Sequence, residues 1–293
     1  MQTVRPSVNQ PSVEERFFDV DGSRMRYLHA GAGPPVVLVH GLMGYSFSWR
    51  NTISTLAGQL EVFAIDAVGT GYSDRPPALD CTLKASAQRL LRFMDAASTE
   101  PFDVVGTSHG GGVAMMAAAL RPERVRRLIL VDPVNPWAPR GKRLAPFLSN
   151  PLIAPVFVQV ASHSRSLRRY YFRRLWGDPR RIPPGTFEGY AKPLEHADAW
   201  RYGISVLQRW NEDLQELELA LPRIANVPTL LIWGSRDKAV APASAERLKQ
   251  NFRQCRLVIM GGIGHLPYEE APDEFNRVVR EFLLSRTSPD GLV

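Results

Sequence analysis

The chain has 293 residues, of which 44% are hydrophobic, so it is long enough to bury a large core without disulfide or metal staples. Its formal net charge of +7 could attract a polyanion, but no nucleic-acid-binding motif accompanies the basic residues, and no nucleic-acid partner is expected. The two cysteines, Cys81 and Cys255, are too few for a disulfide framework and lack the spacing of metal ligands, so we expect a reducing compartment and no metal site.

The N-terminal segment, residues 1–15, is polar and has no apolar stretch of the kind found in signal peptides. It predicts a flexible tail on a cytoplasmic protein, and an edge strand is expected next, over residues 17–28. Short apolar runs bounded by Gly or Pro then follow, which is typical of parallel strands covered on both faces. These runs span residues 36–39, 62–65, 103–105, 128–131, 229–233 and 257–260.

Helical patterns separate these runs, with apolar residues on one face over residues 83–94, 114–120 and 275–282. Alternating strands and helices predict an α/β protein with a mostly parallel central sheet and helices on both of its faces. In such a sheet, ligands bind at the carboxyl ends of the strands. The chemistry is therefore expected in the loops that follow the strands.

The alternation is interrupted over residues 133–222, where no strand pattern occurs and Pro, Arg and aromatic residues are frequent. This predicts a helical cap, inserted into a core that both ends of the chain build from residues 16–132 and 223–286. Residues 287–293 are expected to form a second flexible tail.

The segment around Ser108 carries the strongest chemical signal. Gly106-Thr-Ser-His-Gly110 directly follows a predicted strand and precedes an alanine-rich helix. A nucleophile on a sharp strand-to-helix turn needs small residues on either side, and the two glycines supply that room. The alternative is a glycine-rich connection with an incidental serine, but the strand–turn–helix context favours Ser108 as a nucleophile.

A serine hydroxyl is a poor nucleophile unless a histidine takes its proton and a carboxylate orients that histidine. His265 lies in a glycine-rich loop after the last predicted strand, and Asp237 lies just after the preceding strand. These residues are predicted as the base and the acid. Asp132 also follows a strand and competes for the acid role, although Asp-Pro favours a turn. Asp66 precedes the serine in the chain and is expected to organise its own loop.

Attack on a carbonyl also needs two hydrogen-bond donors for the oxyanion. The residue after the nucleophile, His109, and Leu42 in the loop after an early strand are the expected backbone donors. Glycines at positions 41 and 44 would let the main chain approach the reacting carbonyl. A simple strand-ending turn would use the same residues, so both readings of this loop stay open.

Taken together, the motifs resemble those of the α/β-hydrolase superfamily, in the same order and over both core segments. They are His40-Gly-Leu-Met-Gly44, Asp66-Ala-Val-Gly-Thr-Gly-Tyr-Ser73, Gly106-Thr-Ser-His-Gly110, Trp233-Gly-Ser-Arg-Asp237 and Gly264-His265. The resemblance implies a triad of Ser108, Asp237 and His265, an oxyanion hole at Leu42 and His109, and a lid after the sixth core strand. The related haloalkane dehalogenases and epoxide hydrolases place Asp where this chain has Ser108, which disfavours both of those chemistries.

The expected function is therefore that of a carboxylesterase-like serine hydrolase, which cleaves an ester of a small to medium, largely apolar substrate and needs no cofactor. The resemblance also leaves open a C–C bond hydrolase of the meta-cleavage-product type, a perhydrolase or an acyltransferase with the same triad. A ligand-binding receptor on this fold is the alternative from outside enzymes.

Aromatic residues of the predicted cap could line an apolar substrate pocket, with Trp137, Trp176 and Trp210 as candidates, or could form the cap's own core. The cap is also rich in arginine, which is typical of a solvated helix face. A substrate carboxylate or an anionic membrane surface is the alternative partner for these side chains, and the membrane is the less favoured of the two. They are Arg165, Arg168, Arg169, Arg173, Arg174, Arg180 and Arg181.

Overall fold

The structure is a computed structural model that describes residues 11–138, 145–148 and 150–285. Its centre is an eight-stranded sheet in the order β1-β2-β4-β3-β5-β6-β7-β8, in which every pair from β4 to β8 is parallel. The predicted α/β class with a mostly parallel sheet is confirmed. The strands are β1 (Glu14–Val20), β2 (Ser23–Ala30), β3 (Pro35–Val39), β4 (Glu61–Ile65), β5 (Phe102–Thr107), β6 (Val125–Val131), β7 (Thr229–Gly234) and β8 (Cys255–Met260).

The edge of the sheet holds two strands in the region where an edge strand is expected, around residues 17–28. Two antiparallel strands, β1 and β2, form a hairpin there, and β2 pairs antiparallel with β4. The turn between them contains Asp21 and Gly22, both at positive φ (56° and 73°), which is the backbone geometry that an Asp-Gly hairpin turn favours. Strand β1 begins at Glu14, two residues before the predicted core boundary at residue 16.

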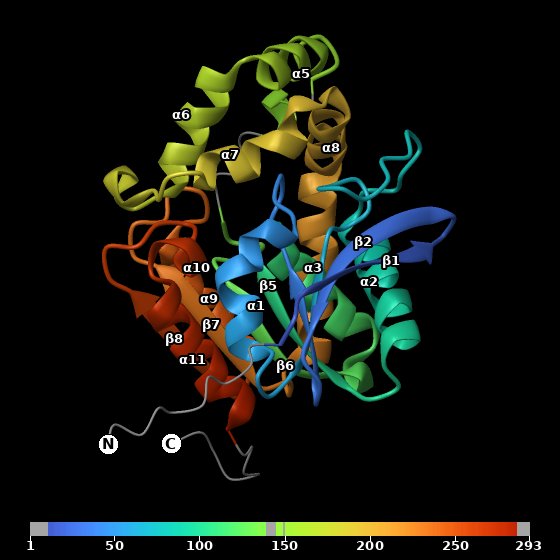
Figure 1. Ribbon diagram of the computed structural model, residues 1–293, viewed down its shortest axis with the longest axis vertical. Coiled ribbons are helices and arrows are strands. Elements are labelled where there is room, and N and C mark those ends of the chain that lie inside the picture. Colours follow the sequence, from blue (N-terminus) through green and yellow to red (C-terminus); the bar gives the residue numbers. More distant parts are fainter. Residues whose placement is uncertain (1–10, 139–144, 149, 286–293) are drawn as a thin grey trace, which may run out of the picture.

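Helices cover both faces of the sheet, as Figure 1 shows. Side chains alternate along β3: Val37 and Val39 pack into the cluster with α2 and α3, whereas Val36 and Leu38 pack into the cluster with α1 and α11. The helices of the core are α1 (Arg50–Leu56), α2 (Leu83–Ala97), α3 (His109–Leu120), α9 (Ala245–Lys249), α10 (Pro267–Glu270) and α11 (Pro272–Leu284).

The chain between β6 and β7 forms further helices, which stand above the carboxyl ends of the strands in Figure 1. Part of the predicted cap, residues 139–144 and 149, lies outside the described residues. Among the residues that the structure does describe, no helix is long and apolar enough to cross a membrane. The helices of this segment are α5 (Ala154–His163), α6 (Arg165–Leu175), α7 (Thr186–Ala191) and α8 (Ala197–Ala220).

Helix α8 runs from this helical segment down into the core, where a buried carboxyl group meets α2. Asp213 is 5% exposed and accepts a hydrogen bond from the backbone amide of Leu83, the first residue of α2. Burial raises the pKa of Asp213 to about 7. The folded protein thus retains the Asp213 proton over a pH range in which an unfolded chain loses it.

This pKa predicts a pH-dependent stability. Because the folded-state pKa lies above the unfolded value of ~4, the stabilising contribution is complete below that value and is lost as the pH rises toward 7. We expect the free energy of unfolding of Asp213→Asn to fall less between pH 5 and pH 8 than that of the wild type. At pH 8 the variant should therefore be the more stable protein. Urea denaturation at pH 5 and pH 8 measures it. Glu216→Gln is the matched control, because Glu216 lies on α8 like Asp213 but is half-exposed and pairs with Lys84 of α2. An equal loss of unfolding free energy between pH 5 and pH 8 in wild type and Asp213→Asn would contradict the prediction.

Candidate active site

Ser108 lies on a sharp turn between β5 and α3. Its φ of 52° is in the left-handed region, which non-glycine residues seldom adopt, and its amide donates to Val131 O at 2.9 Å. The flanking glycines make the turn feasible. A Cβ at Gly106 would lie 2.5 Å from Gly110 O, and a Cβ at Gly110 would overlap the carbonyl of His40. This strained, tightly packed turn is the expected setting for an exposed serine nucleophile.

The other predicted residues come from the next strands across the sheet. Asp132 directly follows β6, Asp237 lies three residues beyond β7, and His265 lies in the loop after β8. Since β5, β6, β7 and β8 are neighbours and parallel, their carboxyl ends meet at one edge of the sheet. The fold thus brings these loops together, although they are far apart in the sequence.

His265 and Asp237 are directly paired. His265 Nδ1 lies 2.8 Å from Asp237 Oδ2, and both side chains are buried. Asp237 Oδ1 accepts from the amides of Ala239 at 2.6 Å and Val240 at 3.1 Å, which fixes the carboxylate. With its proton on Nδ1 toward the carboxylate, the imidazole has Nε2 as its accepting atom. Among the described residues, no hydrogen bond joins the Ser108 and His265 side chains.

Asp132, the competing acid, lies beside this pair. Its carboxylate, that of Asp237 and the His265 ring each offer an atom within 4.8 Å of the others. Asp132 Oδ1 accepts from Gly234 N at 2.9 Å. Burial, followed by the negative charge of Asp237, raises the pKa of Asp132 well above its usual range. Asp237 is therefore the carboxylate that pairs with His265, and Asp132 favours its protonated form.

The three groups also have the residue types of a metal site. Both oxygens of Asp237 are already engaged, one by His265 and the other by backbone amides. Asp132 has one oxygen engaged by Gly234 and a raised pKa, which opposes ligation because a metal requires the deprotonated form. The donor set fits a hydrogen-bond network better than a metal centre.

The loop after β3 approaches the serine closely. A Cβ on Gly41 would lie 3.0 Å from the Cβ of Ser108. The loop turns back on itself, with Gly44 N donating to Gly41 O at 2.9 Å and Met43 at a φ of 64°. Within the described part of the chain, the amides of Leu42 and His109 donate to no backbone carbonyl. Both predicted oxyanion donors are thus free to bind another acceptor.

His40 holds this loop in place. Its Nε2 accepts from the Ala67 amide at 3.1 Å, so the proton of the neutral ring is on Nδ1, which donates to Gly41 O at 2.8 Å. Burial lowers the pKa of His40 and keeps the ring neutral. The loop after β3 and the loop after β4 are thereby tied together through one imidazole.

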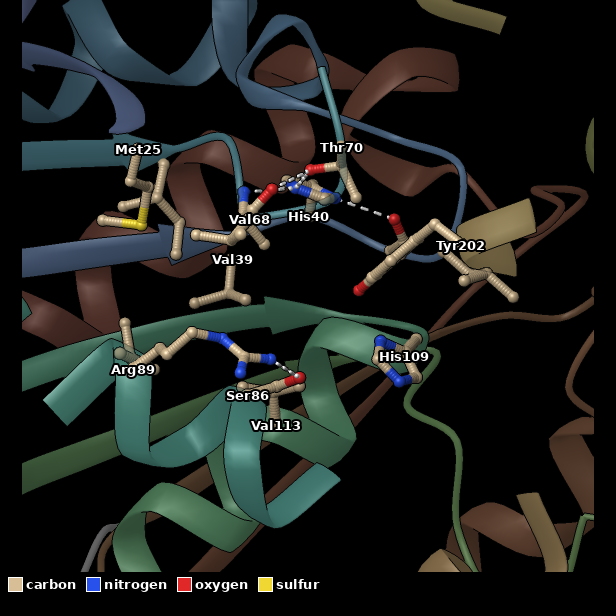
Figure 2. Close-up of a pocket in the computed structure, with 15 residues that line it drawn as sticks. Met25, Val39, His40, Val68, Thr70, Ser86, Arg89, His109, Val113 and Tyr202 are labelled. Atoms are coloured by element: carbon tan, nitrogen blue, oxygen red, sulfur yellow. Dashed lines mark hydrogen bonds between the residues drawn. The ribbon is translucent and has the colours of Figure 1, made fainter. Parts of the chain in front are cut away.

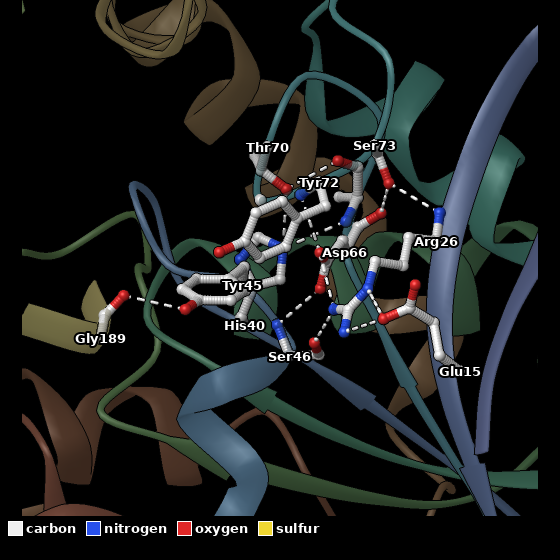
Figure 3. A network of polar contacts seen from close by, with 12 residues as sticks. Glu15, Arg26, His40, Tyr45, Ser46, Asp66, Thr70, Tyr72, Ser73 and Gly189 are labelled. Carbon is white, nitrogen blue, oxygen red and sulfur yellow. Dashed lines mark hydrogen bonds and ion pairs between the residues drawn. The ribbon is translucent and has the colours of Figure 1, made fainter. Parts of the chain in front are cut away.

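Asp66 organises the same region, as Figure 3 shows. Its carboxylate accepts from the amides of Ser46 at 2.8 Å and Tyr72 at 2.9 Å, and pairs with Arg26 Nη1 at 3.2 Å. These contacts join three separate segments beneath the loop after β3. Asp66 thus positions the loops, and no contact found among the described residues joins it to Ser108, Asp237 or His265.

The three tryptophans considered for a substrate pocket or for the cap's own core have different surroundings. Trp176 is completely buried in the cluster with Phe172. Trp137 is partly buried, with Arg247 over its ring at 5.0 Å, and Trp210 stacks near the His109 ring at 6.4 Å. Neither of the two described pockets is lined by any of the three tryptophans. Trp176 thus belongs to a core cluster, whereas Trp210 packs beside His109, which lines a pocket.

The arginine-rich run is mostly exposed, as a solvated face should be, but Arg168 is not. Arg168 is 7% exposed and donates to the carbonyls of Ala161 and Ser162 near the C-terminus of α5. Arg165 and Arg169 pair with Glu188 on the surface, at 2.8 and 3.1 Å. Arg168 therefore has a structural role that its sequence context did not reveal.

Two residues outside the predicted set lie next to the site. Tyr202 of α8 and Arg89 of α2 line a pocket together with Leu42 and His109 (Figure 2). Tyr202 has a weak sequence signal, since Val206 follows at helical spacing and is also buried. Arg89 has none, because arginine on a helix is ordinarily exposed.

Comparisons with known proteins agree with this architecture. Residues 34–272 match the family model described as alpha/beta hydrolase fold. The chain is 28% identical to haloalkane dehalogenase 2 of Mycobacterium tuberculosis, over 92% of this chain and 94% of the relative. It is 27% identical to lipase 1 of Psychrobacter immobilis, over 86% and 78%. The crystal structure of a putative lipase from Acinetobacter baumannii superposes with a TM-score of 0.79 at 23% identity, covering 93% of this chain and 91% of that one.

Proposed function

This chain belongs to the alpha/beta hydrolase fold family, and from that premise we propose that it is a serine hydrolase that cleaves an ester bond through an acyl-enzyme on Ser108. The observation that carries the proposal is the 2.8 Å contact between His265 Nδ1 and Asp237 Oδ2, at the carboxyl edge of the sheet where the Ser108 turn also lies. The proposed substrate is a small to medium, largely apolar ester.

A serine at position 108 separates this proposal from the dehalogenase chemistry of one relative. Displacement of a halide by a serine oxygen would leave an alkyl ether, which water does not hydrolyse at neutral pH. Attack on a carbonyl instead leaves an ester on the serine, which a second attack by water can cleave. The nucleophile therefore supports acyl transfer, as in the lipase named among the relatives.

The proposed cycle uses only groups of this chain. His265 Nε2 takes the Ser108 proton as the serine oxygen bonds to the ester carbonyl carbon, and the Leu42 and His109 amides stabilise the oxyanion. His265 then donates that proton to the leaving alcohol. Water, deprotonated by His265, attacks the acyl group, and the acid departs as the Ser108 hydroxyl re-forms.

A panel of p-nitrophenyl esters from acetate to octanoate tests the activity, with 1-chlorobutane and a meta-cleavage product as alternatives. We expect saturable release of p-nitrophenol from the esters, and negligible release of chloride from 1-chlorobutane. Turnover of the meta-cleavage product with no ester hydrolysis would replace the ester assignment by C–C cleavage, and halide release alone would contradict the acyl mechanism.

A further inference from the structure

The loop that carries His265 is packed directly against the helical segment between β6 and β7, which we call the β6–β7 segment. The backbone amide of His265 donates to the carbonyl of Leu175, the last residue of α6, at 2.7 Å. A Cβ on Gly264 would overlap that same carbonyl, and a Cβ on Gly177 would lie 2.7 Å from the Gly264 nitrogen. The two segments therefore meet backbone against backbone, with no room for a side chain at these two glycines.

Glu270, the last residue of the short helix α10 that follows His265, joins these two segments. Its Oε1 accepts from Gly264 N at 2.7 Å, and both of its carboxylate oxygens lie 3.0 Å from Gly177 N. Neither amide donates to a backbone carbonyl in the described part of the chain, so Glu270 is the acceptor for both. A carboxylate, which only accepts hydrogen bonds, matches a pair of N–H donors.

On its other side, the His265 loop is tied to the loop that carries Asp237. Arg236, which precedes Asp237, donates its backbone amide to Ile263 O at 2.8 Å. The side chains of Asp237 and His265 then pair at 2.8 Å. The imidazole and its carboxylate therefore share one backbone scaffold, and Glu270 joins that scaffold to the β6–β7 segment.

The part of the β6–β7 segment that meets this loop is itself anchored. Trp176, which lies within it, is completely buried in a core cluster. Glu269, the neighbour of Glu270, accepts from the Tyr190 hydroxyl of α7 at 2.7 Å. Helix α10 thus contacts the β6–β7 segment through two adjacent carboxylates, but only Glu270 also binds the amide next to His265.

The position of His265 matters at every step of the proposed cycle. Its Nε2 must come within hydrogen-bond reach of the Ser108 oxygen, and later of the leaving alcohol and the attacking water. A displacement of about 1 Å in such a site can slow the reaction by ~100-fold. Without an acceptor at position 270, the Gly264 and Gly177 amides would be left unpaired, and the loop would shift to pair them again.

We propose that Glu270 is a positioning residue for His265: its carboxylate holds the histidine loop against the β6–β7 segment, and so sets the reach of the imidazole toward Ser108. The effect on catalysis rests on the proposed ester hydrolysis. Because His265 acts in both acylation and deacylation, loss of Glu270 should lower kcat through both steps. Glu270 lines neither described pocket, so KM should change little.

The test removes the acceptor and keeps the length of the side chain. Glu270→Met should lower kcat for p-nitrophenyl butyrate by roughly 10- to 100-fold, with little change in KM. Glu270→Gln keeps one oxygen, which can take the place of Oε1 and accept from Gly264 N, so it should be more active than Glu270→Met. Gly177→Ala reaches the same contact from the other side, because its Cβ would press on the Gly264 nitrogen, and it should lower kcat as well.

Tyr190→Phe is the matched control, because it removes the other hydrogen bond between α10 and the β6–β7 segment and leaves the His265 loop untouched. It should keep the wild-type kcat. A wild-type kcat in Glu270→Met, or a loss no larger than that in Tyr190→Phe, would overturn the proposal. Should Glu270→Met fail to fold, the kcat of Gly177→Ala decides in the same way.

A second measurement does not depend on turnover. The proton between His265 Nδ1 and Asp237 should give a proton NMR signal at low field, which is assigned by its absence in His265→Gln. We expect this signal to shift or broaden in Glu270→Met and to stay unchanged in Tyr190→Phe. An unchanged signal in Glu270→Met would contradict the positioning role, whereas absent ester turnover with a signal that depends on Glu270 would contradict only the proposed function.

Discussion

Ser108→Ala is expected to lower kcat for p-nitrophenyl butyrate by a factor of ~10⁶, which is the effect typical of removing the serine from a triad. In the proposed mechanism the Ser108 hydroxyl oxygen bonds to the acyl group, and alanine has no atom that can replace it. Because alanine at position 108 removes one oxygen and keeps the turn, the variant should fold normally.

Steady-state kinetics measure this loss, with thermal unfolding as the check on folding. Ser98→Ala serves as a matched control, since Ser98 caps the C-terminal end of α2, lines neither described pocket, and its hydroxyl accepts from the Glu100 amide at 3.2 Å. A Ser108→Ala protein that hydrolyses the ester at more than about a hundredth of the wild-type rate would show that the nucleophile is another group.

Asp237→Asn is expected to lower kcat by a factor of ~10⁴ with little change in KM, since an amide would hold His265 in the wrong tautomer. Asn at this position can donate to Nδ1, which leaves the proton on Nε2 and blocks the base. Asp132→Asn is the matched comparison, because both changes replace a buried carboxyl with an amide.

The raised pKa of Asp132 favours its neutral form, so an amide is a close mimic of the group that is already there. We expect Asp132→Asn to reduce kcat by less than roughly tenfold, far below the effect of the acid. The kcat values of Asp132→Asn and Asp237→Asn, measured at the same pH, show which carboxyl group supports His265. A larger loss of kcat in Asp132→Asn than in Asp237→Asn would assign the acid role to Asp132.

Much of the core could be predicted from the sequence because buried parallel strands have a local signature. Residues 36–39 and 62–65 are continuous in apolar residues, and each lies within a strand covered on both faces. The edge was predicted in outline: an edge strand was expected around residues 17–28, and the structure divides this region into β1 and β2 at the Asp21-Gly22 turn.

The candidate site was predicted from motif order, whereas the walls of the neighbouring pocket were not. Ser108 and His265 lie in glycine-rich loops after strands, which is a pattern that a sequence displays. Arg89 and Tyr202 belong to two helices that are more than 100 residues apart, and only tertiary packing brings them to one pocket. No local pattern distinguishes a helical arginine that is buried from one that is solvated.

The most direct test of the central claim is covalent labelling of Ser108 by a fluorophosphonate, followed by intact-protein and peptide mass spectrometry. An activated serine should attack phosphorus and displace fluoride, which gives one adduct per chain on the peptide that contains Ser108. The Ser108→Ala protein should remain unlabelled under the same conditions. An unlabelled wild type, or a Ser108→Ala protein labelled to the same extent, would contradict a serine hydrolase built on Ser108, His265 and Asp237.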